Sequence, residues 1–318
     1  MIFPVYGENS PEKMYGFSFG QQYGFVQGQA LELVYPYLTL GEFLSELRYD
    51  MKPVFYYGIT LDFGLKDPAK TFGLFSSASL KIGIPGDSGI HENRDWRSTI
   101  NADLTDFSRH TNKTREFYWF DIAAGVSIPA ANLFYIKPFI SGSWMRFAFT
   151  GRDGYGLYAR SNGVHFHPID DNPIFIPFSG DVINYEQNWL IIAAGLTAGA
   201  KINPFTINVS SQISPFAYCA AIDEHIHRNI VWRDFTGWLF FLGNSAGIAL
   251  FMESGASLSF TINPIELSLD FSYRHIGNTK GIVFENLNDT GFRLTDSLAG
   301  AGLSLKSFRF LVKINVGL

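Results

Sequence analysis

Long apolar runs, pairs of cysteines and clusters of positive charge are all missing from this sequence. The longest apolar segments, 189–200 and 238–252, are too short or too polar for a membrane-spanning helix, which needs about 18 apolar residues. A single cysteine, Cys219, excludes an intrachain disulfide. The net charge of −5, without a Lys/Arg cluster, argues against nucleic acid as a partner.

Aromatic residues and glycine are abundant instead. Aromatics make up 16% of the 318 residues and there are 31 glycines, whereas only 17% of residues are charged. Soluble domains carry about a quarter charged residues. The mean hydropathy is nevertheless close to neutral, at +0.07. This combination is typical of a β-barrel, whose strands turn one face to lipid and the other to a polar lumen.

Several segments alternate between apolar and polar residues, as strands do. In 47–63 the odd positions are apolar or aromatic and the even positions carry most of the charges, and 265–274 and 308–318 follow the same pattern. We predict that the apolar positions face lipid and the polar ones face the lumen. On this interpretation the following charged residues form ion pairs inside the barrel: Glu46, Arg48, Asp50 and Lys52.

The connections between these segments predict the topology. Short connections are expected at 66–68, 128–130, 203–204 and 263–264, and long polar loops at 36–43, 92–113, 152–180, 220–245 and 276–298. Bacterial barrels have short turns in the periplasm and long loops outside. We therefore predict an all-β protein, a ten-stranded antiparallel transmembrane β-barrel over 14–318, with a flexible leader over 1–13.

Two short motifs at the loop ends of strands suggest chemistry. Asp223 and His225 are two residues apart, so on extended backbone they share a face, where the carboxylate can orient the imidazole and the imidazole can take a proton from water. Asn93 and Asp95 have the same spacing and, if the strand keeps its register, point into the lumen. Glu32 has lumen parity in its own strand.

These motifs, in this order, resemble the omptins, which are ten-stranded outer-membrane endoproteases. The similarity spans about residues 17–318, with added length near 235–250. Asp223-Glu224-His225 is similar to the Asp-His dyad of the family, and Asn93-Arg94-Asp95-Trp96 to its Asp-Gln-Asp-Trp stretch. Three further segments are similar to family motifs: Asp106-Phe107-Ser108-Arg109-His110, Glu32-Leu33-Val34-Tyr35 with Ser45-Glu46-Leu47, and Arg146-Phe147-Ala148-Phe149-Thr150.

The resemblance implies that a water, with no acyl-enzyme, attacks the peptide bond. His225 is then the general base, Asp223 its orienting partner, and Asp95 the partner of a first acid that is Asn93 here. An amide can hold a water by hydrogen bonding, but it cannot carry negative charge or accept a proton. We therefore expect His225 and Asp223 to catalyse more slowly than they would with an acid at position 93. Asn93 in place of that acid affects the activity and not the fold.

Further roles follow from the same resemblance. Glu32 and Asp106 are expected to attract basic side chains of a polypeptide substrate, and Ala221, in place of a second acid, makes the pocket more permissive. Arg146 is expected to bind a lipid phosphate, although its basic partner is Asn188 here. Lipid A or another outer-leaflet lipid is the one activator we expect, with no metal or other cofactor. The protein should be a monomer in the bacterial outer membrane, its active site facing the exterior.

Other functions remain open. Asn93 favours a catalytically inactive omptin-fold barrel, an adhesin that binds host or envelope proteins through its acidic rim. Ser108 with His110 suggests a serine protease, but this spacing predicts no oriented triad. The His-x-His pairs at 165–167 and 225–227 suggest a metal, but no third ligand is specified. A small pore is disfavoured because side chains fill a ten-stranded lumen.

Overall fold

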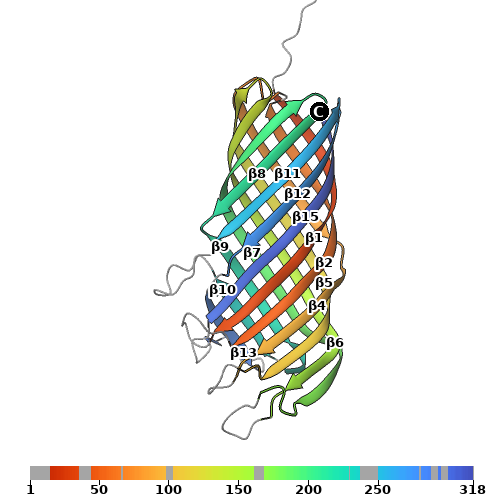
Figure 1. Cartoon of the computed structure of the whole chain (residues 1–318), viewed down its shortest axis with the longest axis vertical. Helices are drawn as coiled ribbons and strands as arrows, with labels where there is room; N and C mark the ends of the chain where they lie inside the picture. Colours follow the sequence, from red (N-terminus) through yellow and green to blue (C-terminus); the bar gives the residue numbers. More distant parts are fainter. Residues whose placement is uncertain are drawn as a thin grey trace, which may run out of the picture.

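The computed structural model describes residues 15–35, 44–65, 67–97, 103–160, 168–228, 230–236, 250–278, 281–287, 293–294 and 300–317. Nearly all of them lie in antiparallel strands that close into a barrel, which confirms the predicted all-β fold. Figure 1 shows this barrel upright, with the C-terminus at its upper end. No helix among these residues is long and apolar enough to cross a membrane. The predicted leader over 1–13 and the predicted loop at 36–43 lie outside the described residues.

The barrel wall contains full-height strands and shorter strands stacked end to end. The full-height strands are β1 (Tyr15–Tyr35), β2 (Ser45–Leu65), β5 (Asp106–Ala131), β6 (Phe134–Tyr158), β7 (Ile174–Ile202) and β15 (Gly300–Gly317). At the turn end the ring is completed by β3 (Gly73–Gly83), β8 (Phe205–Ser214), β11 (Phe251–Ile262) and β12 (Ile265–Ile276). At the loop end it is completed by β4 (Gly86–Asp95), β9 (Ala217–His225), β10 (Ile230–Thr236) and β13 (Gly281–Leu287). Within the described residues, ten strands surround the lumen at either level, as predicted.

Two small elements lie at the loop end. The 3-10 helix η1 (Ile226–Arg228) follows β9, and β14 (Arg293–Leu294) pairs with β13. The turn end carries both described chain ends, since Ser18 pairs with Gly317. Three of the predicted turns are found close to where we expected them, at 68–70, 203–204 and 263–264.

The turn predicted at 128–130 lies a few residues further on, at 132–133. Pro129 stays within β5, opposite Tyr135, next to a β-bulge. A proline lacks the N–H that a ladder needs, and a bulge is one of the places where a strand tolerates it. The proline therefore marks the end of the regular ladder rather than the turn.

Strands at the loop end also reach further than we predicted. β4 ends at Asp95 and β5 begins at Asp106, so the loop expected over 92–113 is reduced to 96–105. The loops expected at 152–180, 220–245 and 276–298 are shortened in the same way by β6 and β7, by β9 and β10, and by β13. Apolar and polar residues do not alternate cleanly in these stretches, so the sequence carried no strand signal there. The candidate catalytic residues consequently lie on strands and not on loops.

An apolar outer surface covers the turn-side half of the barrel. On β2 the exposed side chains are Phe55, Tyr57, Ile59 and Leu61. Neighbouring strands continue this surface with Phe19, Leu80, Ile122, Leu196, Leu258, Leu267 and Phe310. Such an apolar band is typical of the membrane-spanning zone of a barrel. The loop-side half, whose outer face carries ion pairs of Glu46 with Arg48 and Arg94, stands beyond it.

β2 changes the face that its odd residues present. On the turn side Val54 and Tyr56 are buried in the lumen, whereas on the loop side Tyr49 and Met51 are. Between them, β2 has one more residue than β1, a β-bulge that reverses the parity of everything beyond it. The predicted ion-pair ladder inside the lumen was therefore wrong: its members, Glu46, Arg48, Asp50 and Lys52, face outward, and Arg48 and Lys52 are 38% and 56% exposed.

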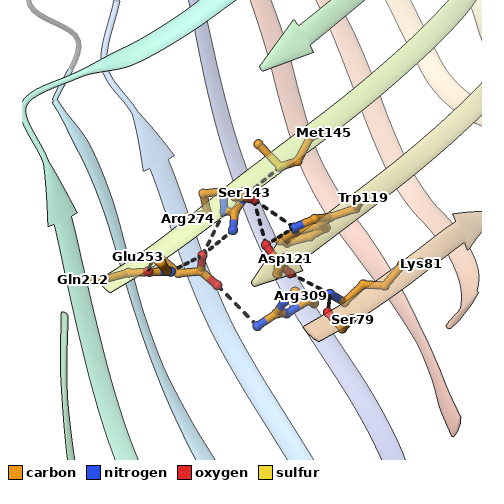
Figure 2. Close-up of polar contacts among 11 residues, drawn as sticks. Ser79, Lys81, Trp119, Asp121, Ser143, Met145, Gln212, Glu253, Arg274 and Arg309 are labelled. Atoms are coloured by element: carbon orange, nitrogen blue, oxygen red, sulfur yellow. Dashed lines mark hydrogen bonds and ion pairs between the residues drawn. The ribbon is translucent and has the colours of Figure 1, made fainter. Parts of the chain in front are cut away.

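Paired charges lie in the lumen near the end of β3 and the start of β11, and Figure 2 draws their contacts. Lys81 Nζ lies 2.7 Å from Asp121 Oδ2. Arg274 and Arg309 both bind the carboxylate of Glu253, at 2.5 and 3.3 Å. A cavity of about 230 Å³ borders this cluster. Among the described residues, the mouth at the loop end is thus separated from the turn end by a layer of ion pairs.

Candidate functional site

Four strands carry the predicted site residues to the loop-side mouth of the barrel. β4 and β9 are separated around the ring by β5, β6 and β7, so their pairs occupy different sides of the mouth. The predicted residues are Glu32 on β1, Asn93 and Asp95 on β4, Asp106 on β5, and Asp223 and His225 on β9.

Asp223 and His225 form a hydrogen-bonded pair at the end of β9. His225 Nε2 lies 3.0 Å from Asp223 Oδ2, and the carboxylate side chain is 5% exposed. The other carboxylate oxygen of Asp223 has no hydrogen-bond partner among the described residues. Because a carboxylate only accepts, Nε2 carries the proton of the neutral imidazole, and Nδ1 is its basic nitrogen.

Asn93 and Asp95 face the lumen, and Ser45 of β2 lies between them. Ser45 Oγ is 2.6 Å from Asp95 Oδ1 and 3.1 Å from Asn93 Oδ1. The register needed for this is set by a bulge between Asp87 and Gly89, where Gly89 has a φ of 109°. A side chain rarely adopts this φ, so glycine allows the bulge that brings the odd residues of β4 back to the lumen.

Glu32 is buried on the lumen side of β1, with 2% of its surface exposed. Burial raises the pKa of Tyr185 well above its ordinary value, and the nearby Glu32 carboxylate raises it further. Gln187, which lies with Tyr185 on β7, donates through Nε2 to the carbonyl oxygen of Leu31 on β1 at 3.3 Å, and this contact crosses the lumen. Ala221, at the position where the resemblance implies a second acid in the omptins, is also buried.

Asp106 is held in an internal ion pair that the sequence did not reveal. Arg97 binds its two carboxylate oxygens at 2.5 and 2.6 Å, Thr105 Oγ1 donates at 2.9 Å and the Ala159 backbone N–H at 3.3 Å. The residue is 2% exposed. A basic substrate side chain would have to compete with Arg97, and the predicted role of Asp106 in substrate binding stays a prediction.

A stack of buried rings beneath the mouth was missed by the sequence analysis. His91 is 1% exposed and stacks on Tyr49 with ring centroids 4.3 Å apart. His110 lies on β5 with its ring 5.4 Å from that of His91. His91 has the lumen parity of Asn93 and Asp95, and this was the signal that would have found it.

Burial disfavours the charged form of both histidines of this stack. Burial lowers the pKa of His91 well below its ordinary value, and the charges of His110 and His225 lower it further. Burial also lowers the pKa of His110, against the raising effect of its hydrogen bond to the Asp153 carbonyl. Neither ring nitrogen of His91 has a hydrogen-bond partner among the described residues.

Ser108 and His110 are hydrogen-bonded, with 3.1 Å between Ser108 Oγ and His110 Nε2. The other ring nitrogen of His110 lies 2.6 Å from the backbone carbonyl oxygen of Asp153. A nucleophilic serine needs a base oriented by an acid, and here a carbonyl occupies that position. The geometry gives no support to the serine-protease alternative.

Arg146 lies on the outer face of β6, above the apolar band. It forms ion pairs with Glu116 at 3.1 Å and with Glu186 at 2.8 Å. Asn188 is its cross-strand partner and donates to Glu186. A lipid phosphate at this position would meet a guanidinium that two carboxylates already neutralise, and the lipid-binding role stays a prediction.

A metal site has no geometric support in the described part of the chain. No group of three or more His, Cys, Asp or Glu side chains there is arranged to hold a metal ion. The His-x-His pair at 165–167 lies outside the described residues.

Comparison with known proteins agrees with the motifs and the barrel. The sequence matches the profile of the Omptin family over residues 13–316. The chain belongs to the omptin family. This omptin is similar in structure to the outer membrane protease OmpT from Escherichia coli, with a TM-score of 0.78 and 17% identity over 95% of this chain and 97% of that one. The translocator domain of the autotransporter NalP from Neisseria meningitidis gives a TM-score of 0.32 at 12% identity, over 95% of this chain and 88% of that one. No curated protein sequence matches this omptin.

Proposed function

We propose that this omptin is an endopeptidase of the bacterial outer membrane, with an active site that opens at the loop-side mouth toward the cell exterior. The observation that carries the proposal is the buried, hydrogen-bonded pair of Asp223 and His225, which shares the mouth with Asn93 and Asp95. Family membership supports it, as does the fold shared with OmpT, which is an outer membrane protease.

In this proposal His225 removes a proton from water through Nδ1. Asp223 accepts the Nε2 hydrogen bond, which fixes the tautomer and stabilises the imidazolium after proton transfer. The hydroxide attacks the peptide carbonyl directly, and the imidazolium then protonates the leaving amine. Asp95 and Asn93 hold the water from the β4 side, Asp95 as a charged acceptor and Asn93 by an amide hydrogen bond.

Substrate preference follows from the acidic side chains of the mouth. Glu32 is buried and faces the lumen, so it attracts a basic side chain next to the scissile bond. Ala221 adds no charge there, and Asp106 is engaged by Arg97. The site therefore prefers Arg or Lys less strictly than one with a full set of free carboxylates.

Outer-leaflet lipid is the activator we propose, bound near Arg146. Because Glu116 and Glu186 pair with Arg146, activation by lipid A is weak or is replaced by another lipid. The barrel acts as a monomer on polypeptide substrates.

The second candidate is an inactive omptin-fold barrel that binds proteins at the cell surface, and Asn93 is the observation that favours it. Changing Asn93→Asp discriminates between the two. A large gain in cleavage identifies a weakened protease. A pore is a poorer candidate, since ion pairs of Lys81 with Asp121 and of Arg274 with Glu253 occupy the lumen.

The test is cleavage of a quenched fluorescent peptide library with Arg-Arg, Lys-Arg and Arg-Lys centres. Refolded protein in detergent is assayed with and without lipid A, beside a His225→Ala variant. Cleavage at basic sites that His225→Ala abolishes supports the endopeptidase. A correctly folded barrel that cleaves nothing under either condition favours the binding protein.

A further inference from the structure

Ser45 lies where β2 begins, directly opposite Asp95 in the ladder with β4. Its hydroxyl oxygen is 2.6 Å from Asp95 Oδ1 and 3.1 Å from Asn93 Oδ1, so one hydroxyl contacts both residues of the β4 pair. We propose that Ser45 is a positioning residue that relays a hydrogen bond from the Asn93 amide to the Asp95 carboxylate, and thereby fits an amide into the place of an acid. The proposal rests on the proposed peptidase function.

The number of protons determines the direction of this relay. A hydroxyl has one hydrogen to donate, and an ionised carboxylate can only accept. The Ser45 proton therefore goes to Asp95. The structure has Asn93 Oδ1 toward Ser45, but an amide oxygen there would meet a hydroxyl whose only proton is already used. We therefore assign the flipped amide, in which the Nδ2–H group of Asn93 faces Ser45 and donates to its oxygen.

The two distances agree with this assignment. A separation of 2.6 Å between Ser45 and Asp95 is typical of an O–H donor on a charged oxygen. A separation of 3.1 Å between Ser45 and Asn93 falls in the range of N–H···O bonds and is long for O–H···O. The oxygen and nitrogen of an amide are interchangeable by a flip, so the hydrogen-bond network assigns them.

The relay has two consequences for the site. With its nitrogen on Ser45, the Asn93 amide turns its oxygen away from Ser45, where it can accept a hydrogen bond from water. The neutral amide cannot share a proton with Asp95 as a second acid would. The pair thus combines one carboxylate with one amide, and Ser45 fixes the orientation of both side chains.

Kinetics of Ser45 variants test the relay. Ser45→Ala should lower kcat by about tenfold with little change in KM, since a hydrogen bond to a charged group is lost near the reacting water. Ser45→Thr keeps the hydroxyl and should retain activity, and Ser211→Ala, on the outer face of β8, serves as the matched control. The double variant Asn93→Ala with Ser45→Ala should have a kcat no more than about 10–30-fold below that of the wild type. This loss is well short of the product of the two single losses, which is what independent residues would give. Unchanged kcat in Ser45→Ala, or fully multiplicative losses, would overturn the relay.

A second readout does not need activity. For the wild type and for each Ser45 variant, the infrared spectrum of the corresponding Asp95→Asn protein is subtracted, which isolates the carboxylate band of Asp95. The intensity of this band is then followed as a function of pH. Without the Ser45 hydroxyl the charged form loses a donor, so the midpoint should rise by about one pH unit in Ser45→Ala and stay in place in Ser45→Thr. If the wild type cleaves no peptide but this shift appears, the proposed function fails and the relay stands. An unshifted midpoint refutes the relay whatever the protein cleaves.

Discussion

Acid should destabilise this barrel through His91, and a single substitution measures the effect. The ring is buried between Tyr49 and His110, and His225 is close enough to affect its titration. In the unfolded chain a histidine titrates near pH 6.5. In the folded barrel the pKa of His91 is well below that value, because burial disfavours the charged form.

The sign follows from proton binding. Between the folded pKa and about pH 6.5 the unfolded chain binds more protons than the native barrel, so stability is full above this window and falls as pH drops through it. One such histidine costs about 1.4 kcal/mol of unfolding free energy per pH unit. His110, whose pKa burial also lowers, contributes in the same direction.

His91→Phe removes the titration and keeps a flat ring against Tyr49. We expect the unfolding free energy, measured by denaturant titration in detergent from pH 7.5 to 5, to be parallel in the two proteins above about pH 6.5. Below about pH 6.5 it should fall less steeply in this variant, by about 1.4 kcal/mol per pH unit. His227→Phe changes an exposed histidine and serves as the control. A slope in His91→Phe equal to that of the wild type would mean that His91 is not held uncharged in the native barrel.

Three other predictions concern contacts of the site and the wall. Arg97→Ala releases the Asp106 carboxylate, so KM for Arg-containing peptides should fall about 3–10-fold relative to KM for neutral peptides. KM values equal to those of the wild type would exclude a substrate role for Asp106. Asp121→Asn leaves Lys81 buried without its carboxylate and should cost about 3–5 kcal/mol in denaturant titrations, whereas an unchanged midpoint would contradict the buried pair. Gly89→Ala strains the bulge at a φ of 109° and should slow cleavage and destabilise the barrel by about 1–3 kcal/mol, and wild-type behaviour would show that the bulge is dispensable.

Strand parity predicted the lumen-facing residues wherever one face was clearly apolar. The ten-strand topology was found in this way, and the side chain of Glu32 does face inward. Asn93 and Asp95 also face inward, but only because the bulge at Gly89 restores the parity that is lost where β3 gives way to β4. The same reasoning failed on β2, because one extra residue opposite β1 reverses parity while the sequence keeps alternating. A bulge has no reliable composition, so it appears only when the partner strand is in place.

Other features of the site depended on the closed barrel. The pairing of Asp106 with Arg97 joins residues on either side of a loop, where no periodicity applies. The stack of Tyr49 with His91 and His110 requires three strands in register. Motif similarity named the residues of the mouth, whereas their partners, Ser45 above all, could be seen only in three dimensions.

The joints between stacked strands give the two halves of the barrel different cooperativity. β3 gives way to β4 at 84–85 and β8 to β9 at 215–216, so part of the ladder around the mouth is not continuous with the ladder in the apolar band. Opening the mouth therefore breaks hydrogen bonds of β4 and β9 without breaking those of β3 and β8. The mouth is a separate unit of local unfolding, whose amides should exchange with solvent at a lower free energy than those of the membrane half.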